Sequence, residues 1–469
     1  MEGLEAVVIN YSVCSSIIDF RIDANTFKKE YIKSDRLINS KPNHTVEELS
    51  TSVQNFGAYS LCNLINFTDS GIPFLMTQNI RHNYIDWNID KYVDDESHAL
   101  LYKSHCKKGQ VLVTMAGEYL GRVAVYDRYK VCSSNQAIAK VTLKPNLNPY
   151  IVSTFLNSKH GQNQINRFKT ITGQPNINMS LIKSLKIPVF SDSFEIHIEN
   201  LISESERKRN ATAQQYQTAE YILLEAIGLN NFEPNTDSVN IKSYKDSFLK
   251  TGRLDAEYYQ KKYDDYINLI CSYPNGCDTI QRSCVQKDSN FKPEDNEEYN
   301  YIELSDIGKS GEIKGCTTAQ GIELPTRARR KVKTGDVIIS SIEGSLDSCA
   351  VITEEYNNAL CSTGFYIINS KKINSETLLV LFKSEPMQNI LKKSCSGTIL
   401  TAINKTEFQD IPVPFIEDAI QQKIKENVSE SFLLQKQSEL LLETAKRAVE
   451  IAIEENENEA LKYIESLEI

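Results

Sequence analysis

The chain has 469 residues, enough for about two to four domains, and its 41% hydrophobic and 24% charged content is typical of a globular protein. No apolar run approaches the roughly 18 residues of a membrane span, the N-terminus lacks a basic signal-peptide region, and the 11 scattered cysteines indicate a reducing, cytoplasmic compartment. The net charge of −10 gives nucleic-acid binding no support, but Phe415–Ile469 alone carries −7, which leaves −3 for the rest of the chain.

The first half of the chain predicts a mixture of short helices and strands. Arg21–Tyr31 is a short helical segment, and Phe74–Ile80 is a strand that runs into a turn. Gly109–Val125 has the pattern of two strands joined by a loop, and Pro149–Asn166 has helical composition. Thr172–Val189 is a glycine-containing loop that ends in a strand, Ile-Pro-Val.

A long helix is predicted next, over Asp192–Ile227. This stretch contains no Gly and no Pro, and it is rich in Glu, Ala, Gln and Leu, which favour helices. At 1.5 Å per residue it would span about 55 Å, which is too long for an ordinary core helix.

The second half repeats these elements in the same order, at offsets between 224 and 232 residues. The counterparts are Arg253–Tyr263, Tyr301–Ile307, Gly335–Val351, Ser375–Lys393, Ser396–Val413 and a long helical stretch at Ala419–Ile464. An order kept twice at a nearly constant offset is typical of internal duplication. We therefore predict an α+β fold built as a tandem duplication, with one globular domain and one long helix in each half.

The two long helical stretches also match residue by residue. Two stripes with heptad spacing recur after a shift of 226 residues, which favours two long helices packed closely side by side. The first stripe comprises Ile198, Ser205, Thr212, Ala219 and Ala226, which fall on Ile424, Ser431, Ser438, Ala445 and Ala452. The second stripe comprises Ile202, Arg209, Tyr216 and Leu223, which fall on Val428, Gln435, Leu442 and Val449.

The matching pieces form a frame, whereas the loops between them differ. Asn83–Lys108 corresponds to Gly311–Lys333, and Gly117–Arg122 corresponds to Gly344–Ser348. A duplicated frame with divergent loops suits two readers of different targets, although neutral drift of surface loops explains it equally well. The predicted boundaries are 1–191 and 247–414 for the globular domains, 192–246 for the first helix with a linker, and 415–469 for the second helix.

This pattern resembles a family, the DNA specificity subunits of type I restriction–modification systems and the related subunits of type IIB systems. The resemblance spans Arg21 to Leu467 and rests on the paired strands GQVLVTMAG and GDVIISSIEG, the paired TG and SG loops ending in IPV, and the long helix after each. It implies a non-catalytic protein in which two target-recognition domains lie on two long antiparallel, coiled-coil-like helices, and each domain reads one half of a split DNA sequence. The repeated Arg-[Ile/Leu]-Asp-Ala segments at Arg21 and Arg253 occur in both system types and do not separate them.

The resemblance also implies partners: double-stranded DNA, two N6-adenine methyltransferase subunits and, in restriction complexes, a motor-nuclease subunit. The helix pair would set the gap between the half-sites and dock the methyltransferase subunits. The residues expected on the docking helices are Ile198, Ile202, Tyr216, Leu223, Ile424, Val428, Leu442 and Val449.

No catalytic residue, cofactor or metal site is predicted. An adenine methyltransferase needs a cofactor loop and an Asn/Asp-Pro-Pro-aromatic motif, and the chain offers only Asn148-Pro149-Tyr150, which we interpret as a turn before a helix. No GxxxxGK[ST] phosphate loop is present, so no motor is expected. Cys271, Cys277 and Cys284 are spaced too widely for a zinc knuckle and are better interpreted as idle or buried thiols.

The residues expected at DNA are polar or basic side chains on or beside the loops. Arginine and lysine suit phosphate and guanine, and amide side chains suit adenine, but solvated side chains are equally common at such positions. The candidates are Gln78, Asn79, Arg81, His82, Arg122, Lys169, Thr172, Gln174, Arg327, Arg329, Arg330, Lys331, Lys392, Lys393 and Thr398.

Two other function classes stay open from the sequence. One is a DNA methyltransferase or nuclease with an unrecognised site, which activity of the purified chain with S-adenosylmethionine or magnesium would support. The other is a structural coiled-coil adaptor without a role at DNA, which would leave two globular repeats unused. The specificity-subunit interpretation uses both repeats and both helices, and we prefer it.

Overall fold

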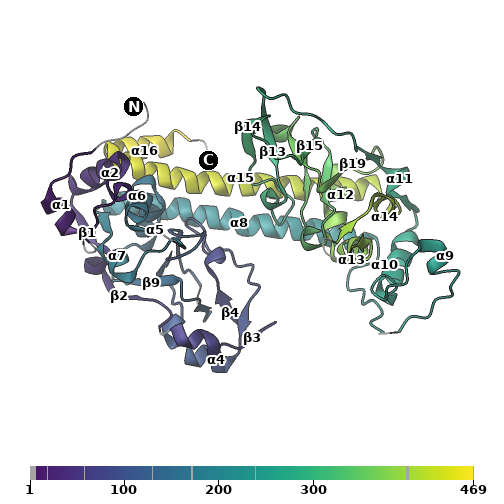
Figure 1. Cartoon of the computed structure of the whole chain (residues 1–469), viewed down its shortest axis with the longest axis horizontal. Coiled ribbons are helices and arrows are strands. Elements are labelled where there is room, and N and C mark those ends of the chain that lie inside the picture. Colours follow the sequence, from purple (N-terminus) through teal and green to yellow (C-terminus); the bar gives the residue numbers. More distant parts are fainter. Residues whose placement is uncertain are drawn as a thin grey trace. The chain divides into compact units, whose positions relative to one another are not determined.

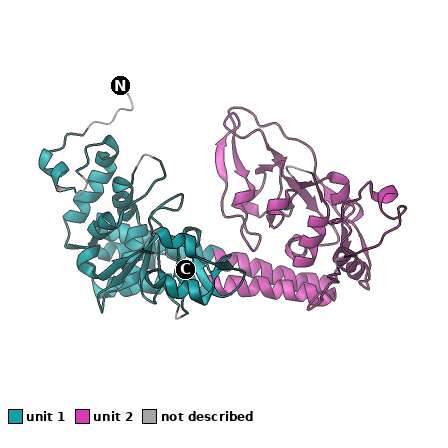
Figure 2. Cartoon of the chain, turned by 60° about the horizontal axis from the view of Figure 1, so that its bottom comes forward, with its two compact units in different colours: residues 1–208, 436–469 teal, residues 209–435 magenta. Residues whose placement is uncertain are grey.

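The computed structural model describes residues 7–17, 20–57, 59–128, 130–170, 173–237, 239–397 and 401–467 (Figure 1). The chain divides into two compact units: unit 1 comprises 1–208 with 436–469, and unit 2 comprises 209–435 (Figure 2). Both boundaries fall inside the long helices, so each unit holds a globular part and half of each helix. This division differs from the predicted one, which kept each long helix as a segment of its own.

Unit 1 contains two four-stranded sheets and a two-stranded pair. Its strands are β1 (Asn43–Thr45), β2 (Ser50–Gln54), β3 (Phe67–Thr68), β4 (Ile72–Leu75), β5 (Tyr92–Val93), β6 (Val111–Thr114), β7 (Val123–Val125), β8 (Ser133–Ser134), β9 (Ile138–Leu143) and β10 (Lys186–Pro188). The main sheet has the antiparallel order β2-β9-β6-β7, the second sheet has the order β3-β5-β4-β8, and β1 pairs with β10. Its helices are α1 (Tyr11–Ser16), α2 (Lys29–Asn39), α3 (Val46–Leu49), α4 (Asp95–Leu100), α5 (Pro149–Asn157), α6 (Lys159–Phe168) and α7 (Met179–Ser184), with 3-10 turns η1 (Ala24–Phe27), η2 (Tyr59–Leu64), η3 (Thr77–Asn79) and η4 (Tyr102–Ser104).

Unit 2 repeats this architecture. Its strands are β11 (Cys277–Thr279), β12 (Val285–Gln286), β13 (Glu298–Ile302), β14 (Thr317–Gln320), β15 (Ala328–Lys331), β16 (Val337–Ser340), β17 (Cys349–Val351), β18 (Leu360–Ser362), β19 (Phe365–Asn369), β20 (Cys395–Ser396), β21 (Ala402–Ile403) and β22 (Pro412–Pro414). Its helices are α9 (Phe248–Thr251), α10 (Lys261–Cys271), α11 (Ile280–Ser283), α12 (Ser375–Lys383), α13 (Glu385–Lys393) and α14 (Lys405–Gln409), with 3-10 turns η5 (Leu304–Asp306), η6 (Glu343–Ser345) and η7 (Glu354–Tyr356).

The strand orders confirm the predicted duplication and the α+β class. The main sheet of unit 2, β12-β19-β16-β17, repeats the order of unit 1, and β11 pairs with β22 as β1 pairs with β10. In the second sheets, β4 and β8 run parallel, as do β13 and β18. The outer strands of those second sheets differ, because unit 1 adds β3 and β5 on one side whereas unit 2 adds β14 and β15 on opposite edges.

The central strand of each main sheet is buried on both faces. Val111 and Val113 of β6 pack in the main core of unit 1, whereas Leu112 packs on the opposite face with a separate cluster. Val337 and Ile339 of β16 in unit 2 alternate in the same way. Since side chains alternate along a strand, a strand between two cores needs the continuous apolar run that both segments carry.

The helical segment after each main sheet is two helices, not the single one predicted. The break falls at Ser158 between α5 and α6, and at Ser384 between α12 and α13. Both serines have extended backbone angles, and each donates its hydroxyl to a carbonyl three residues back, Phe155 or Leu381. A hydroxyl that bonds the local backbone competes with helix continuation, which accounts for the break.

The long helices are α8 (Asp192–Ala226) and α15 (Asp418–Glu454). The first matches its predicted bounds closely. The second is shorter than predicted, because a separate helix α16 (Glu457–Glu465) follows it. Asn456 lies between them with an extended backbone, and its side chain accepts a hydrogen bond from the Glu459 amide, which begins the new helix.

The small-residue stripe is the contact line between α8 and α15, and the two helices run antiparallel. In unit 1, the Ser205 and Ser438 hydroxyls each donate to the carbonyl of the other residue, at 2.9 Å. In unit 2, the Ser431 hydroxyl donates to the Thr212 carbonyl at 3.1 Å. Only small side chains let two backbones approach to this distance, so the heptad stripe records the interhelical packing.

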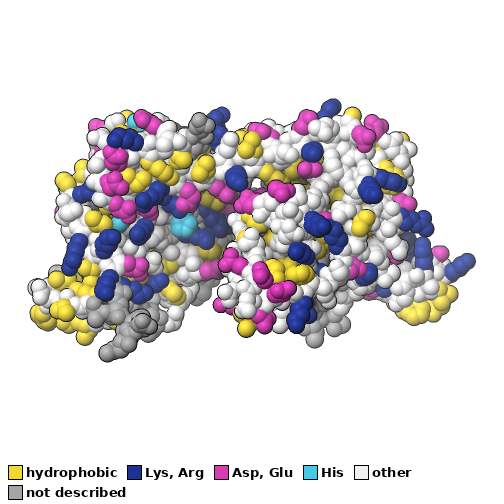
Figure 3. Space-filling model, turned by 90° about the horizontal axis from the view of Figure 1, so that it is seen from above, with side chains coloured by type: hydrophobic (Ala, Val, Ile, Leu, Met, Phe, Trp, Pro, Cys, Tyr) yellow, Lys and Arg dark blue, Asp and Glu magenta, His cyan; other side chains and the backbone are white. Residues whose placement is uncertain are grey.

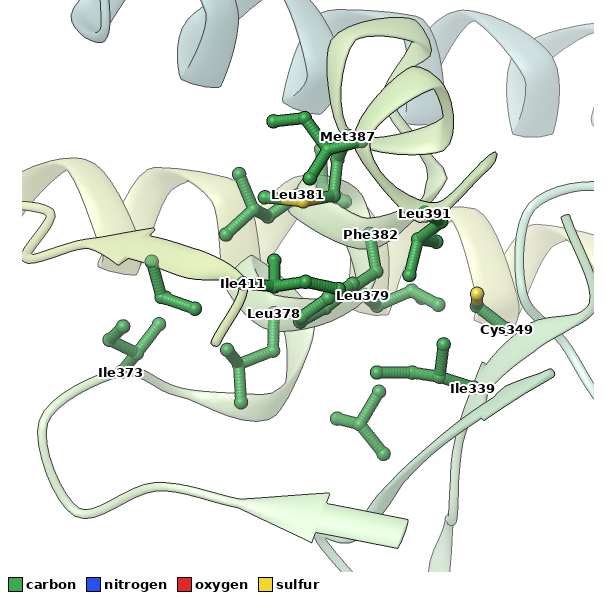
Figure 4. Packing of buried hydrophobic residues seen from close by; sticks show 14 of the residues in the cluster. Ile339, Cys349, Ile373, Leu378, Leu379, Leu381, Phe382, Met387, Leu391 and Ile411 are labelled. Carbon is green, nitrogen blue, oxygen red and sulfur yellow. The ribbon is translucent and has the colours of Figure 1, made fainter. Parts of the chain in front are cut away.

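The main core of unit 2 lies between its sheet, helices α12 and α13, and the long helices (Figure 4). Leu378, Leu379 and Phe382 of α12 are fully buried in it and face Ile339 of the sheet. Leu223 of α8 and Ile424 of α15 belong to the same cluster. The long helices are therefore part of each unit's core as well as a link along the chain.

Candidate nucleic-acid interface

Two loops are joined in the same way in both units. In unit 1 the β6–β7 loop meets the glycine loop, where the Ile177 amide donates to the Met115 carbonyl at 2.9 Å and the Gly117 amide donates to the Pro175 carbonyl at 3.0 Å. In unit 2 the equivalent bonds run from Ile403 to Ser341 at 2.8 Å and from Glu343 to Thr401 at 3.1 Å. Every residue in the second set lies 226 positions after its counterpart in the first. The paired loops form the candidate site.

Arg122 occupies this site in unit 1. Its guanidinium lies over the Tyr119 ring, 4.4 Å from the ring centroid, and burial followed by the nearby Arg81 charge lowers the pKa of Arg122. Within the described residues, its Nη1 is buried and has no hydrogen-bond acceptor. Two half-buried arginines and one unsatisfied donor favour an anionic or acceptor-rich ligand.

Gln174 reaches the same site from the glycine loop. Gly117 has a φ of +83°, and a Cβ at this position would lie 3.1 Å from the Gln174 amide nitrogen. Glycine therefore allows both the turn and the close approach of Gln174. The structure brings these two loops together, and Gln174 is exposed.

The residues after β4 have mixed positions. Gln78 is exposed, but Asn79 is buried. Its Oδ1 accepts a hydrogen bond from the Met76 backbone amide, and its Nδ2 donates to the carbonyls of Asp86 and Asn88. Asn79 is thus a turn residue. Because its side chain is hydrogen-bonded to the backbone of the same turn, it is not available for the predicted contact with adenine. Arg81 lies 3.5 Å from the Asp86 carboxylate, and His82 Nδ1 lies 2.9 Å from Asn157 Oδ1.

In unit 2 the basic cluster lies on β15 and at the residue just before it, and β15 is an edge strand of the second sheet. Arg327, Arg329 and Lys331 are exposed. The register of β15 against β18 shifts between Ala328 and Arg330, so Arg329 is the extra residue of a bulge. A bulge redirects a side chain, and basic residues also protect an open sheet edge, so this cluster has two physical uses.

Arg330 is the half-buried member of that cluster. Its Nη1 donates to the Asp288 carbonyl, whereas its Nε is buried without a hydrogen-bond acceptor in the described part of the chain. Arg122 and Arg330 therefore share one property, a buried guanidinium nitrogen that is not satisfied by the protein groups described.

The remaining candidates border the glycine loops. Lys169 donates to Asn166 Oδ1 at 2.9 Å, Lys392 is exposed, and Lys393 lies over the Tyr258 ring at 4.8 Å with its pKa lowered by burial. Thr172 and Thr398 lie outside the described residues.

The sequence did not single out the cation–aromatic pairs beside the site. Arg128 is exposed and lies over the Trp87 ring at 3.9 Å, and Lys331 lies over the Phe291 ring at 5.0 Å. Trp87 is the single tryptophan of the chain and lies in the divergent loop of unit 1, which was the available signal. Stacked arginine and aromatic side chains are common at nucleic-acid surfaces.

The expected docking residues have a different role from the predicted one. Ile198, Ile202, Leu442 and Val449 are buried in the core of unit 1, and Leu223, Ile424 and Val428 are buried in the core of unit 2. Tyr216 packs against the latter core. These side chains hold the chain's own helices together because the heptad stripe is satisfied internally, and they are not free to dock a partner.

No group of three or more histidine, cysteine, aspartate or glutamate side chains suited to a metal occurs among the described residues. Over the same part of the chain, no helix is both long enough and apolar enough to cross a membrane.

Comparison with solved structures returned chains from type I restriction–modification systems. One is the type I restriction–modification S subunit from M. genitalium, at 14% identity and a TM-score of 0.38, with 90% of this chain and 95% of that chain covered. Another comes from a study of complex assembly and conformational transition of the type I R-M system, at 13% identity and a TM-score of 0.29, with coverages of 86% and 97%. A third is the HsdS subunit from Thermoanaerobacter tengcongensis, at 13% identity and a TM-score of 0.28, with coverages of 88% and 95%. No protein-family model matches the sequence, and no curated protein does.

Proposed function

We propose that this chain is the sequence-specific DNA-recognition subunit of a restriction–modification complex. Each unit reads one half of a bipartite, asymmetric target, and the chain itself performs no catalysis. Methylation at N6 of adenine resides in partner subunits, of which two copies bind. Cleavage, where it occurs, resides in a motor-nuclease partner.

The observation that carries this proposal is the repeated loop site. Both units join the β-hairpin loop and the glycine loop through hydrogen bonds at the same two positions, yet they carry different side chains there. A constant support with variable loops is what recognition of two different sequences on one duplex requires. An enzyme duplicated with its active site intact would instead repeat its reactive side chains.

The chemistry of the loops supports DNA as the ligand. Arg122 and Arg330 each keep a buried donor nitrogen without an acceptor in the described residues. Phosphate oxygens and the O6 and N7 atoms of guanine are acceptors of the matching kind. The net charge of −10 means that the partner subunits must supply part of the positive charge around the duplex.

In this proposal the long helices set the gap between the half-sites. Helix α8 has 35 residues and α15 has 37, and each passes from one unit into the other. Inserting four residues, roughly one helical turn or 6 Å, into α8 between Lys208 and Thr212 should lengthen the tolerated gap, with a compensating insertion in α15 as the paired variant.

The direct test maps N6-methyladenine in cells that carry this gene with its neighbouring methyltransferase gene, and again after deletion of this gene. We expect a bipartite motif with a fixed gap that disappears on deletion. A continuous motif, or a pattern indifferent to deletion, contradicts the proposal.

A binding experiment tests the site residues. In the complex with its methyltransferase subunits, Arg122→Ala should weaken binding to the mapped sequence by about 5- to 150-fold, the loss expected for one specific contact of about 1–3 kcal/mol. Arg207→Ala is the matched control, because Arg207 is exposed on α8 and paired with Glu204. Equal affinities for both variants and the wild type contradict a role for the hairpin loop.

A further inference from the structure

Two cysteines of unit 2 place their thiols next to each other at the surface. Cys271 is the last residue of α10, Cys277 is the first residue of β11, and a side-chain hydrogen bond joins the two thiols. All 11 cysteines of the chain are described, and Cys271 is exposed whereas the other ten are half-buried or buried. Figure 3 shows basic and acidic side chains interspersed over one face of the molecule, which selects no class of ligand. Two adjacent thiols do select one, because a thiol reacts with disulfides and other thiol-specific reagents.

The turn between α10 and β11 brings the two cysteines together. Helix α10 ends at Ser272, whose amide donates to the Asn268 carbonyl at 3.0 Å. The chain then reverses in a second turn, where the Gly276 amide donates to the Tyr273 carbonyl at 2.8 Å and Gly276 has a φ of +82°. The chain therefore returns to the end of α10 within the residues 272–276, which accounts for the contact between the thiols.

This turn is held in place by the rest of unit 2. Tyr273 is buried in the main core of the unit. The Gly276 carbonyl accepts a hydrogen bond from the Phe415 amide at 3.0 Å, and Cys277 pairs with Pro414 of β22. A disulfide forms without strain only where the backbone already holds the two Cβ atoms about 3.5–4.5 Å apart. An anchored turn with its thiols in contact is prepared for such a bond.

Unit 1 has the equivalent turn without thiols. Its counterparts are Asn39, the last residue of α2, and Asn43, the first residue of β1. The Asn43 side chain donates from Nδ2 to the carbonyls of Ile38 and Lys41, at 3.2 and 2.9 Å, and so closes the turn with hydrogen bonds. The connection is three residues long in unit 1 and five in unit 2. The fold therefore forms this turn without cysteines, and the thiol pair is a property of unit 2 alone.

The two thiols differ in exposure, which sets the order in which they react. Cys277 is half-buried, and burial followed by the neighbouring Cys271 raises the pKa of Cys277 to about 12. Cys277 therefore stays a protonated thiol at neutral pH and does not begin a reaction. Cys271 is exposed, so it is not one of the buried thiols that the sequence suggested, and a soluble reagent meets it first.

We propose that Cys271 and Cys277 form a modification site that takes a low-molecular-weight disulfide as its co-substrate and closes to an intramolecular disulfide. The Cys271 thiol loses its proton and attacks one sulfur of the small disulfide, whose S–S bond breaks and whose leaving thiolate takes up a proton. Cys277 then loses its proton, attacks Cys271 Sγ and expels the second small thiolate, which is protonated in turn. Two protein thiols are oxidised and one small disulfide is reduced to two thiols, so an excess of small thiol reverses the reaction.

The test treats the full chain with oxidised glutathione under native conditions, followed by acid quenching, alkylation in denaturant and digestion with trypsin. The tryptic peptide Tyr263–Arg282 contains both cysteines of the pair and no other. We expect this peptide to become lighter by two hydrogen atoms and to lose both alkylation sites, and dithiothreitol should restore them. Cys106 and Cys132 are the internal control, because they face each other across a β-bridge but are 5% and 1% exposed, and they should stay reduced.

Two single variants separate the steps. Cys277→Ser should hold Cys271 as a mixed disulfide with glutathione, whereas Cys271→Ser should leave Cys277 reduced. Cys284→Ser, which lies outside the pair, should oxidise like the wild type, and an unchanged thermal unfolding profile verifies that each variant folds. The inference is overturned if the wild-type peptide stays reduced, if it carries glutathione without an internal bond, or if Cys271 links two chains. The proposed function stands in each of these cases, because it does not involve the thiol pair.

Discussion

The main sheets of units 1 and 2 have the same strand order, but different side chains are buried on one face of each sheet. In unit 1, Lys140 of β9 pairs with Leu112 of the central strand β6. At the equivalent place in unit 2, Ile367 of β19 pairs with Ile338 of β16. Lys140 is 1% exposed, and its ammonium donates to the Ser134 hydroxyl at 3.0 Å, beside the buried thiols of Cys106 and Cys132. Ile367 lies in an apolar cluster.

The difference is confined to one side of the sheet. In both units the sheet face toward the long helices packs into an apolar core, and the helices contribute side chains from equivalent positions to it, such as Ile198 of α8 in unit 1 and Ile424 of α15 in unit 2. The opposite face adjoins the second sheet, where the outer strands and the loops also differ. The face that packs against the helices is therefore alike in the two units, whereas the face behind the candidate site differs between them.

The largest effect is expected where the units agree. Ile198 and Ile424 are both fully buried at equivalent helix positions, so Ile198→Ala and Ile424→Ala should each lower the free energy of unfolding by about 2–5 kcal/mol through lost burial and a residual cavity. Hydrogen exchange in denaturant, measured by mass spectrometry on peptides from each unit, reports the two stabilities separately.

Each substitution should act mainly on its own unit, since the two side chains belong to different cores. Surface changes at Gln422 or Ser193, which lie outside these cores, serve as controls and should shift stability by less than about 0.5 kcal/mol. If either isoleucine variant destabilised both units equally, the chain would unfold as a single cooperative block, and the comparison between separate units would lose its thermodynamic meaning.

A smaller change in stability, and a stabilising one, is expected at Lys140, where the two units differ. Burial lowers the pKa of Lys140, and the neighbouring Cys106 and Cys132 raise it in part. Lys140→Met should therefore stabilise unit 1 by about 1–4 kcal/mol at neutral pH, because an apolar side chain replaces a buried charge, as Ile367 does in unit 2.

The stabilisation by Lys140→Met should depend on pH. Between the lowered folded pKa and the unfolded value near 10.4, the unfolded wild-type chain binds more protons than the folded chain, so wild-type stability rises with pH. The advantage of Lys140→Met should accordingly shrink as pH approaches about 10. Ile367→Met in unit 2 is the control and should show no such dependence. If the difference in the free energy of unfolding between Lys140→Met and the wild type stayed constant with pH, Lys140 would be charged to the same extent in the folded and unfolded chain.

The sequence predicted the frame well because the frame repeats. A shift of 226 residues located the hairpins and the contact stripe, and a shift of 224 residues located the glycine loops. The Ser205–Ser438 hydrogen bonds lie where the stripe predicted close helices. The helix breaks at Ser158 and Ser384 were missed, since a buried serine that bonds the preceding turn looks like any other helix residue in composition.

The site was harder to predict, because exposure and partner choice are set by the fold. Asn79 and Gln78 are adjacent and chemically alike, yet one is committed within a turn and the other faces solvent. Likewise, the heptad residues expected on the helices that dock a partner were also expected to pack the chain's two long helices together, and that packing buries all of them except Tyr216. A periodic stripe predicts a helical contact but does not say which helix makes it.

The smallest change in stability is expected at a helix cap that is an asparagine in both units. Asn178 caps α7 by accepting from the Leu181 amide, and Asn404 caps α14 by accepting from the Glu407 amide, each at 2.9 Å. Asn178→Ala and Asn404→Ala should each cost about 1 kcal/mol of local stability, measured by the same hydrogen-exchange method. The Asp variants retain a capping oxygen and should be nearly neutral. Because both asparagines are exposed, the loss reflects the cap and not the core. A cost seen in only one unit would mean that the duplicated loops, though joined by equivalent hydrogen bonds, no longer depend equally on the short helices that follow them.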